Sequence, residues 1–256
     1  MKDLDKTNNY HQFWYEKFFK VYELVQSGVF TPEENKEQAD FIEDVMNLKK
    51  FPHASILDVP CGDGRISVEL AAKGYEVTGI ENNENILRRA IKESHSRKLD
   101  IKYLKSDMRN FPAGRKFDAV ICWFGSFGYF DDAENEKFVK EISNVLKPGG
   151  KFIVDTHSLE TILQSFEKVG MTKVGDTVVI EDRMFDFENS RIAAEWTFIK
   201  DGTTHKASSS IRIYSYKELI ELLKRNGFGN IKAYGSLDKK PFVYGHQRLY
   251  LIAEKI

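Results

Sequence analysis

The sequence has few cysteines, almost no net charge and no long apolar run. Cys61 and Cys122 are its only cysteines and give no disulfide framework, while 38 basic against 39 acidic residues leave a net charge of −1. A chain so close to neutral has no electrostatic footprint for a nucleic acid, so we expect no such partner. No run reaches the length of a membrane span and residues 1–10 hold no apolar signal region, so we expect a cytoplasmic protein without a membrane partner.

The most informative segment runs from Ile56 to Glu81. It has the pattern of an apolar strand, a glycine turn, a helix and a second strand that ends at a carboxylate. Gly62 and Gly64 let the backbone approach a ligand, the first amides of the helix can hold an anionic group, and an acidic residue about 20 positions on can bind a ribose. The pattern predicts a site for a nucleoside cofactor.

A nicotinamide dinucleotide is one candidate, and the glycine pattern disfavours it. Such sites usually carry three glycines as G-x-G-x-x-G, whereas Gly64 is followed by Arg65, Ile66 and Ser67. The chain also has no Tyr-x-x-x-Lys, the catalytic signature that an oxidoreductase of this kind would need. A nicotinamide-dependent oxidoreductase is therefore the competing enzyme class.

The same segment resembles motif I of the class I S-adenosylmethionine-dependent methyltransferases. Asp58, Gly62 and Gly64 stand at the matching positions, and Glu81 stands where the family has its ribose-binding carboxylate. Pro60 departs from the family, which more often has glycine there, and proline removes an amide donor from the loop.

Later segments follow in the order that this family requires. Ser106-Asp107-Met108 resembles the segment that meets the adenine, 117–123 resembles the fourth strand, and 145–155 resembles the turn into the fifth strand. The resemblance implies S-adenosyl-L-methionine as the cofactor and S-adenosyl-L-homocysteine as the product. It assigns these residues to the cofactor: Asp58, Cys61, Gly62, Gly64, Glu81, Asn82, Asp107, Met108 and Trp123.

The resemblance and the alternation of strands and helices predict an α/β fold. We expect a Rossmann-like, mostly parallel sheet of seven strands with an antiparallel last strand, plus a small antiparallel β insertion before the last helix. The chain would be a single methyltransferase domain over residues 1–256. Its parts would be an N-terminal helical lid (1–50), the cofactor-binding core (51–171), the insertion (172–214) and a C-terminal helix with the last two strands (215–256).

Local patterns predict the elements that flank the core. Apolar residues at helical spacing predict a helix over about 11–27, and capping boxes at Thr31 and Ser215 predict two more helices. Alternating residues predict three antiparallel strands in the insertion and two strands at the end of the chain. These strands are 176–187, 191–200, 204–213, 231–236 and 247–253.

Two parts of the chain have roles that the sequence leaves open. Tyr10 and Tyr15 fit lid contact with the cofactor as well as plain helix packing. In the insertion the family commonly carries an acceptor cap or a surface for oligomer contact, so the insertion is the expected surface for a homodimer. Its aromatic residues fit packing of the added sheet better than substrate contact: Phe185, Phe187, Trp196 and Phe198.

Methyl transfer mainly requires that acceptor and methyl be held in line, so a dedicated base is optional. His157 is the candidate catalytic residue, because it follows the fifth strand at the edge where open α/β sheets bind ligands. His246 is the second candidate, since it lies just before the last strand. We expect no metal site.

The sequence as a whole predicts an enzyme that moves a methyl group from S-adenosylmethionine to a nitrogen or oxygen of a small-molecule acceptor. The loop over 123–130 is aromatic and glycine-rich, which resembles small-molecule methyltransferases. It lacks the Asn/Asp-Pro-Pro-Tyr typical of enzymes that methylate base amines or glutamine amides. An RNA or protein acceptor and a non-catalytic cofactor-binding subunit are the alternatives, and the identity of the acceptor stays open.

Overall fold

The structure is a computed structural model that describes residues 14–25, 28–111 and 114–256. The chain divides into two compact units. Of the described residues, the larger unit comprises those within Phe30–Phe166 and Ile213–Ile256, and the smaller one comprises those up to Val29 together with Glu167–Arg212. Tyr10, and with it part of the predicted lid, lies outside the described residues.

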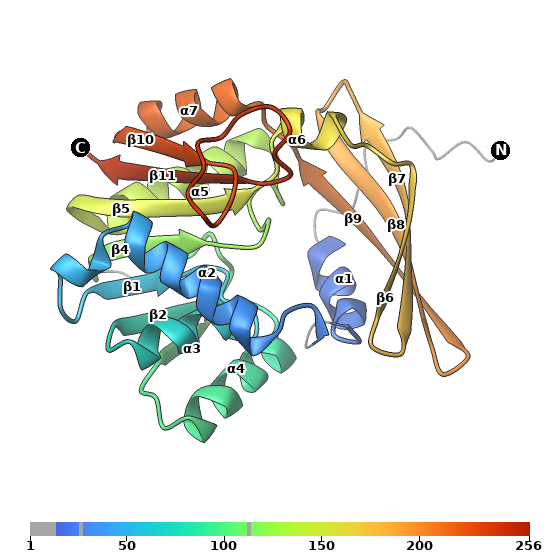
Figure 1. The fold of residues 1–256 in the computed structure, drawn as a ribbon, viewed down its shortest axis with the longest axis horizontal. Coiled ribbons are helices and arrows are strands. Elements are labelled where there is room, and N and C mark those ends of the chain that lie inside the picture. The colour runs from blue at the N-terminus through green and yellow to red at the C-terminus, as the bar shows by residue number, and fades with distance from the viewer. Residues whose placement is uncertain (1–13, 26–27, 112–113) are drawn as a thin grey trace. The chain divides into compact units, whose positions relative to one another are not determined.

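The larger unit contains a seven-stranded sheet in the order β10-β11-β5-β4-β1-β2-β3 (Figure 1). β11 runs antiparallel to its neighbours β5 and β10, whereas the pairs among β1 to β5 are parallel. The predicted mostly parallel sheet with an antiparallel last strand is confirmed. The strands are β1 (Ser55–Asp58), β2 (Glu76–Glu81), β3 (Lys102–Lys105), β4 (Phe117–Cys122), β5 (Leu146–Thr156), β10 (Phe228–Tyr234) and β11 (Leu249–Lys255).

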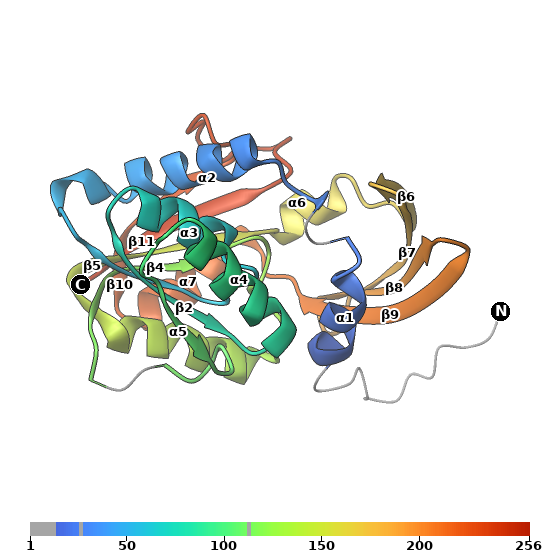
Figure 2. The ribbon, with the colours of Figure 1, turned by 90° about the horizontal axis from the view of Figure 1, so that it is seen from below.

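Helices cover both faces of this sheet, with α2 and α3 on one side and α5 and α7 on the other (Figures 1 and 2). They are α2 (Pro32–Val45), α3 (Arg65–Ala72), α4 (Glu84–Ser96), α5 (Asp132–Val145), α6 (Leu159–Leu163) and α7 (Tyr216–Arg225), with a 3-10 turn η2 at Leu48–Lys50. The capping boxes predicted at Thr31 and Ser215 are both present. Within the described residues, no helix is long and apolar enough to cross a membrane.

The strand register gathers the candidate residues at one edge of the sheet. Asp58, at the end of β1, pairs with Gly79 of β2 and with Ile121 of β4. Because parallel strands end at the same edge, the segments that follow β1, β2, β3, β4 and β5 emerge there together. β11 begins at this edge too, since Leu249 pairs with Thr156.

A buried apolar cluster between α2 and the sheet holds the larger unit together. Phe41 and Ile42 of α2 pack with Ile56, Ile121 and Ile153 from three neighbouring strands. All five are 4% exposed or less, so truncation of any one would cost about 2–5 kcal/mol.

The smaller unit is a four-stranded antiparallel sheet in the order β6-β7-β8-β9, with one helix packed against β9. Its elements are α1 (Trp14–Tyr22), β6 (Val169–Val174), β7 (Thr177–Asp186), β8 (Arg191–Lys200) and β9 (Thr203–Arg212). Phe18 meets the Trp196 ring edge-on at 5.2 Å, so this tryptophan packs the added sheet. The prediction of three strands here was wrong by one, because β6 also pairs with β7.

Candidate cofactor site

The glycine turn between β1 and α3 is held by backbone bonds to both neighbouring strands. Val59 N–H donates to the Ile121 carbonyl (2.9 Å) on one side, and Cys61 N–H donates to the Ile80 carbonyl (2.8 Å) on the other. Gly62 and Gly64 have φ of 56° and 81°, a left-handed conformation that favours glycine. The predicted turn is therefore a fixed loop that ends at the first residue of α3.

Gly64 is also required by packing. A Cβ at Gly64 would lie 2.6 Å from the Tyr103 hydroxyl oxygen and 3.0 Å from the Ala90 Cβ. Gly79 on β2 is equally restricted, since a Cβ there would lie 2.8 Å from the Cys61 sulfur. These two glycines let the loop, β2, β3 and α4 approach one another.

Glu81 joins the glycine turn to the start of α4. Its Oε2 accepts the Gly62 N–H (3.2 Å) and its Oε1 accepts the Asn83 N–H (2.7 Å). Burial raises the pKa of Glu81, although the backbone N–H groups of Asn83, Asn82 and Gly62 lower it in part. Glu81 therefore lies at the end of β2 as a partly buried carboxyl group that accepts backbone hydrogen bonds from the glycine turn and from the start of α4.

Two further acidic residues surround the turn. Asp58 is 1% exposed and accepts a hydrogen bond from the Ser67 hydroxyl (2.6 Å). Burial, together with the charges of Glu81 and Asp63, raises the pKa of Asp58 to about 7, although the Ser67 hydroxyl and the Arg65 charge lower it in part. Burial likewise raises the pKa of Asp63. Three carboxyl groups that repel one another electrostatically thus gather at one turn, which favours a ligand that carries positive charge.

Cys61 carries no charge, whereas Arg65 supplies positive charge beside the turn that lowers the pKa of Asp58 and of Asp63 in part. Burial raises the pKa of the Cys61 thiol well above its usual value, and Asp58 and Glu81 raise it further, so the thiol is neutral. The Arg65 guanidinium lies over the Phe30 ring at 4.0 Å and donates to Asn35 (3.1 Å) and Gln38 (2.8 Å) of α2. Arg65, the basic residue that lies nearest to the turn in the sequence, is therefore bound to α2.

The segment after β3 is fixed next to Glu81. Ser106 N–H donates to the Glu81 carbonyl (3.2 Å), and Asp107 follows directly. The Asp107 carboxylate forms a bidentate ion pair with Arg109, which also bonds Glu134 (2.8 Å). Although burial raises the pKa of Asp107, the bonds from Arg109 lower it overall, so this carboxylate stays ionised. Arg109 is not among the residues predicted for the site, although its Asp-x-Arg spacing from Asp107 was an available signal.

The remaining assigned residues have different surroundings. Met108 is 7% exposed, and Asn82 is exposed with its backbone N–H turned to Glu81. Trp123 is 4% exposed, stacks on Tyr250 at 5.4 Å and donates its indole N–H to Gln38 (2.7 Å). Cofactor contact by these three side chains stays a prediction, and the tryptophan also has a clear packing role.

His157 belongs to a network at the end of β5. Its Nε2 accepts from Arg248 Nη1 (2.8 Å), and Arg248 also pairs with the Asp155 carboxylate through Nε (2.8 Å). Asp155 in turn accepts the N–H of Phe124 (3.0 Å), a residue at φ 59° in the loop after β4. Burial and the Arg248 charge together lower the pKa of His157 to about 4.

This arrangement leaves His157 neutral, with its basic nitrogen already occupied by a donor. It suits a residue that positions the loop after β4 rather than one that takes a proton from an acceptor. His246, the second candidate, lies on the loop before β11, where its Nδ1 is 3.0 Å from the Val243 carbonyl oxygen.

Comparisons with known proteins match this chain to methyltransferases. A family described as "Methyltransferase domain" matches residues 56–150. Rat (Rattus norvegicus) glycine N-methyltransferase is 31% identical over 125 residues, which are 43% of this chain and 42% of that protein. The dTDP-3-amino-3,4,6-trideoxy-alpha-D-glucopyranose N,N-dimethyltransferase of Streptomyces venezuelae is 32% identical over 138 residues, 53% of this chain and 55% of that protein. The chain thus spans about half the length of these relatives.

A solved structure matches over almost the whole chain. The S-adenosylmethionine-dependent methyltransferase from Clostridium acetobutylicum ATCC 824 superposes with a TM-score of 0.79 at 22% identity, covering 94% of this chain and 98% of that one. At this identity the match concerns the fold, including the sheet of seven strands and the added antiparallel sheet.

Proposed function

We propose that the chain transfers a methyl group from S-adenosylmethionine to a nitrogen or oxygen of a small molecule, because residues 56–150 match a methyltransferase-domain family and the fold is similar to that of an S-adenosylmethionine-dependent methyltransferase. The observation that carries this proposal is the cluster of Asp58, Asp63 and Glu81 around the glycine turn. S-adenosylmethionine brings a sulfonium and an ammonium to such a site, whereas a nicotinamide dinucleotide brings an anionic pyrophosphate. The acidic turn therefore favours the first cofactor.

Different residues of the chain would contact different parts of the cofactor. Asp58, Cys61, Gly62 and Gly64 would line its methionine end, and Glu81 would accept bonds from the ribose hydroxyls. Asn82, Asp107, Met108 and Trp123 would lie on the ribose and adenine side. Bound S-adenosylmethionine supplies an electrophilic methyl carbon with a neutral thioether as its leaving group.

The chain's own contribution to the reaction is positioning. The Asp155–Arg248–His157 network fixes the loop after β4 at the edge where the acceptor enters. Alignment of this kind can lower a barrier by roughly 7–11 kcal/mol in favourable cases. A neutral His157 bonds Arg248, which in turn holds the Asp155 carboxylate that accepts the Phe124 N–H of the loop, and a proton released by the acceptor passes to solvent.

The acceptor class rests on relatives and on the loop sequence. Two relatives methylate nitrogen, of glycine and of an amino sugar nucleotide by their names, which supports a nitrogen acceptor on a small molecule. An RNA or protein acceptor remains the alternative, as does a subunit that binds the cofactor without turnover. We also propose a homodimer through the antiparallel insertion and a cytoplasmic location.

Calorimetric titration of the purified protein tests the cofactor. We expect micromolar binding of S-adenosylmethionine and S-adenosylhomocysteine, with none of NAD or NADP. Glu81→Gln should weaken adenosyl binding at least tenfold, because a charged hydrogen-bond acceptor contributes about 1.5–3 kcal/mol. Glu76→Gln, at the other end of β2 with a side chain 63% exposed, is the matched control and should leave the affinity unchanged. Binding of NAD alone would move the function to the oxidoreductase class.

A further inference from the structure

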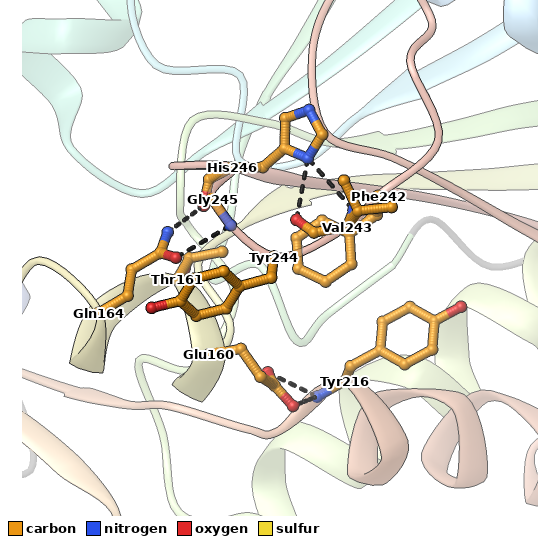
Figure 3. A pocket seen from close by; sticks show the side chains of 9 residues that line it. All are labelled: Glu160, Thr161, Gln164, Tyr216, Phe242, Val243, Tyr244, Gly245 and His246. Carbon is orange, nitrogen blue, oxygen red and sulfur yellow. Dashed lines mark hydrogen bonds between the residues drawn. The ribbon is translucent and has the colours of Figure 1, made fainter.

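A pocket of about 340 Å³ lies in the larger unit and shares no residue with the cofactor set. One wall comes from Glu160 and Thr161 of α6 and from Gln164 directly after it, and another from Tyr216 at the start of α7. The loop before β11 closes it with residues 242–246 (Figure 3). Its volume is in the range of pockets that hold small organic ligands.

The pocket is built by specific contacts. Gln164 holds the loop to α6 from both sides, since its Nε2 donates to the His246 carbonyl (2.5 Å) and its Oε1 accepts the Gly245 N–H (3.1 Å). The His246 ring fills the space beside Gly235, where a Cβ would lie 2.2 Å from the ring. The loop is therefore held in place before any ligand arrives, which reduces the entropy cost of binding.

Aromatic rings form the inner wall. Tyr216 stacks on Phe242 at 5.6 Å with planes 14° apart, and Phe242 stacks on His246 at 6.2 Å with planes 28° apart. At the rim, Tyr244 is 88% exposed and Val243 is 57% exposed. Side chains exposed to this extent at a pocket gain contact area when a flat or apolar group enters.

The charge of the pocket selects the ligand. Glu160 is the only carboxylate among the nine lining residues, and none of the nine is lysine or arginine. Both Glu160 oxygens lie 3.1 Å from the Tyr216 backbone nitrogen, so the carboxylate already occupies the start of α7 and leaves it unavailable to an anion. Figure 3 shows this carboxylate between Tyr216 and Tyr244. A carboxylate beside aromatic rings is the environment that binds organic cations.

We propose that this pocket binds a small organic cation, with its ammonium group at Glu160 and a flat or apolar body against the wall formed by Tyr216, Phe242 and His246. The pocket uses none of the proposed cofactor residues, and the inference does not depend on the proposed methyl transfer.

Titration with three probes of one shape tests the proposal, by calorimetry at pH 8 and without cofactor. Phenethylamine is cationic at this pH, 2-phenylethanol is neutral and phenylacetate is anionic. We expect phenethylamine to bind at least tenfold more tightly than the alcohol, and phenylacetate not to bind. Glu160→Gln should lower the affinity for phenethylamine about tenfold or more while that for the alcohol is retained. Glu221→Gln, on α7 but outside the pocket, should leave both unchanged.

Three results would overturn the proposal: no binding of phenethylamine to the natural chain, equal binding of phenylacetate, or equal binding of phenethylamine to the Glu160 variant. Should that variant fail to fold by circular dichroism, Phe242→Leu provides the second test. It removes a ring from the wall and should weaken the amine and the alcohol alike. These titrations contain no cofactor. A failure to bind S-adenosylmethionine in the separate cofactor titration would therefore contradict the proposed methyl transfer and leave the cation proposal standing.

Discussion

Asp58 is a carboxyl group whose burial works against the stability of the fold. Its pKa is about 7 in the folded chain, against about 3.9 in an unfolded one. The folded state therefore binds the proton more strongly, so stability falls as the pH rises from about 4 to about 7 and stays lowered above that. Each unit of difference corresponds to about 1.4 kcal/mol.

We expect Asp58→Asn to raise the free energy of unfolding, by more at pH 8 than at pH 5. Urea denaturation at the two pH values measures this. Asp118→Asn is the control of opposite sign. Although burial raises the pKa of Asp118, bonds from Lys147 and Ser55 lower it overall, so its ionised form stabilises the fold above its unfolded pKa and the variant should lose stability at pH 8. An Asp58 variant that is less stable than the natural chain at pH 8 would contradict the assignment.

His157 should titrate far below an ordinary histidine. With a pKa of about 4, its imidazole resonances in an NMR titration should stay in the neutral form down to about pH 5. Arg248→Gln should raise the pKa, because it removes a positive charge 2.8 Å from Nε2. A midpoint near 6.5 in the natural chain would restore His157 as a candidate general base.

At the scale of elements, Gln38 links α2 to α3 and to the loop after β4 through its amide oxygen. From α2 it accepts bonds from Arg65 at the start of α3 and from Trp123 after β4, and it is 8% exposed. Both donors border the cofactor loops. Loss of this acceptor would disturb the loops and the core together.

Gln38→Leu should lower the free energy of unfolding by about 2 kcal/mol or more, since a buried donor without an acceptor costs about 1–3 kcal/mol. Thermal denaturation should show a drop of about 4–8 °C. Lys36→Leu places the same side chain at an exposed position of α2 and should change the midpoint little. Equal midpoints for both variants would mean that the Gln38 bonds contribute nothing.

The elements were predictable to different degrees for physical reasons. Glu81 and Gly62 could be found because a strand, a turn and a second strand bring them to one edge by local geometry alone. The bond between Gln38 and Trp123 joins residues 85 positions apart, and that between His157 and Arg248 spans 91. No local pattern marks such pairs. β6 was not predicted because apolar residues on it, such as Met171, are exposed. The strand therefore has no buried face that would give an alternating apolar pattern in the sequence.

At the scale of the whole molecule, the fold class was predicted and is confirmed, since both sheets are of the expected kind. The roles of the site residues and the division of the chain into a lid, core and insertion stay predictions. Two sequence-distant segments build the smaller unit, and their association depends on packing between α1 and β9 that neither segment encodes alone.

The insertion offers a surface for the expected homodimer. Val169 and Met171 lie two residues apart and therefore on the same side of β6, and they are 57% and 75% exposed. Met171 pairs across the sheet with Ile180. Exposed apolar side chains grouped in this way favour association. Met171→Glu should shift a dimer to monomer in sedimentation velocity, whereas Thr172→Glu, on the opposite side of β6, should not. A natural chain that sediments as a monomer would exclude this interface.

The packing around Gly64 and Gly79 affects how such a chain would change over evolutionary time. Tyr103, Ala90 and Cys61 already fill the space beside these glycines, so both residues are needed by the fold even when no nucleoside is bound. A descendant that had lost catalysis would still keep them, and a search based on glycines would still retrieve it. Asp58, whose burial costs stability, is the residue that genetic drift would replace first. Its retention is therefore the better marker of an active lineage.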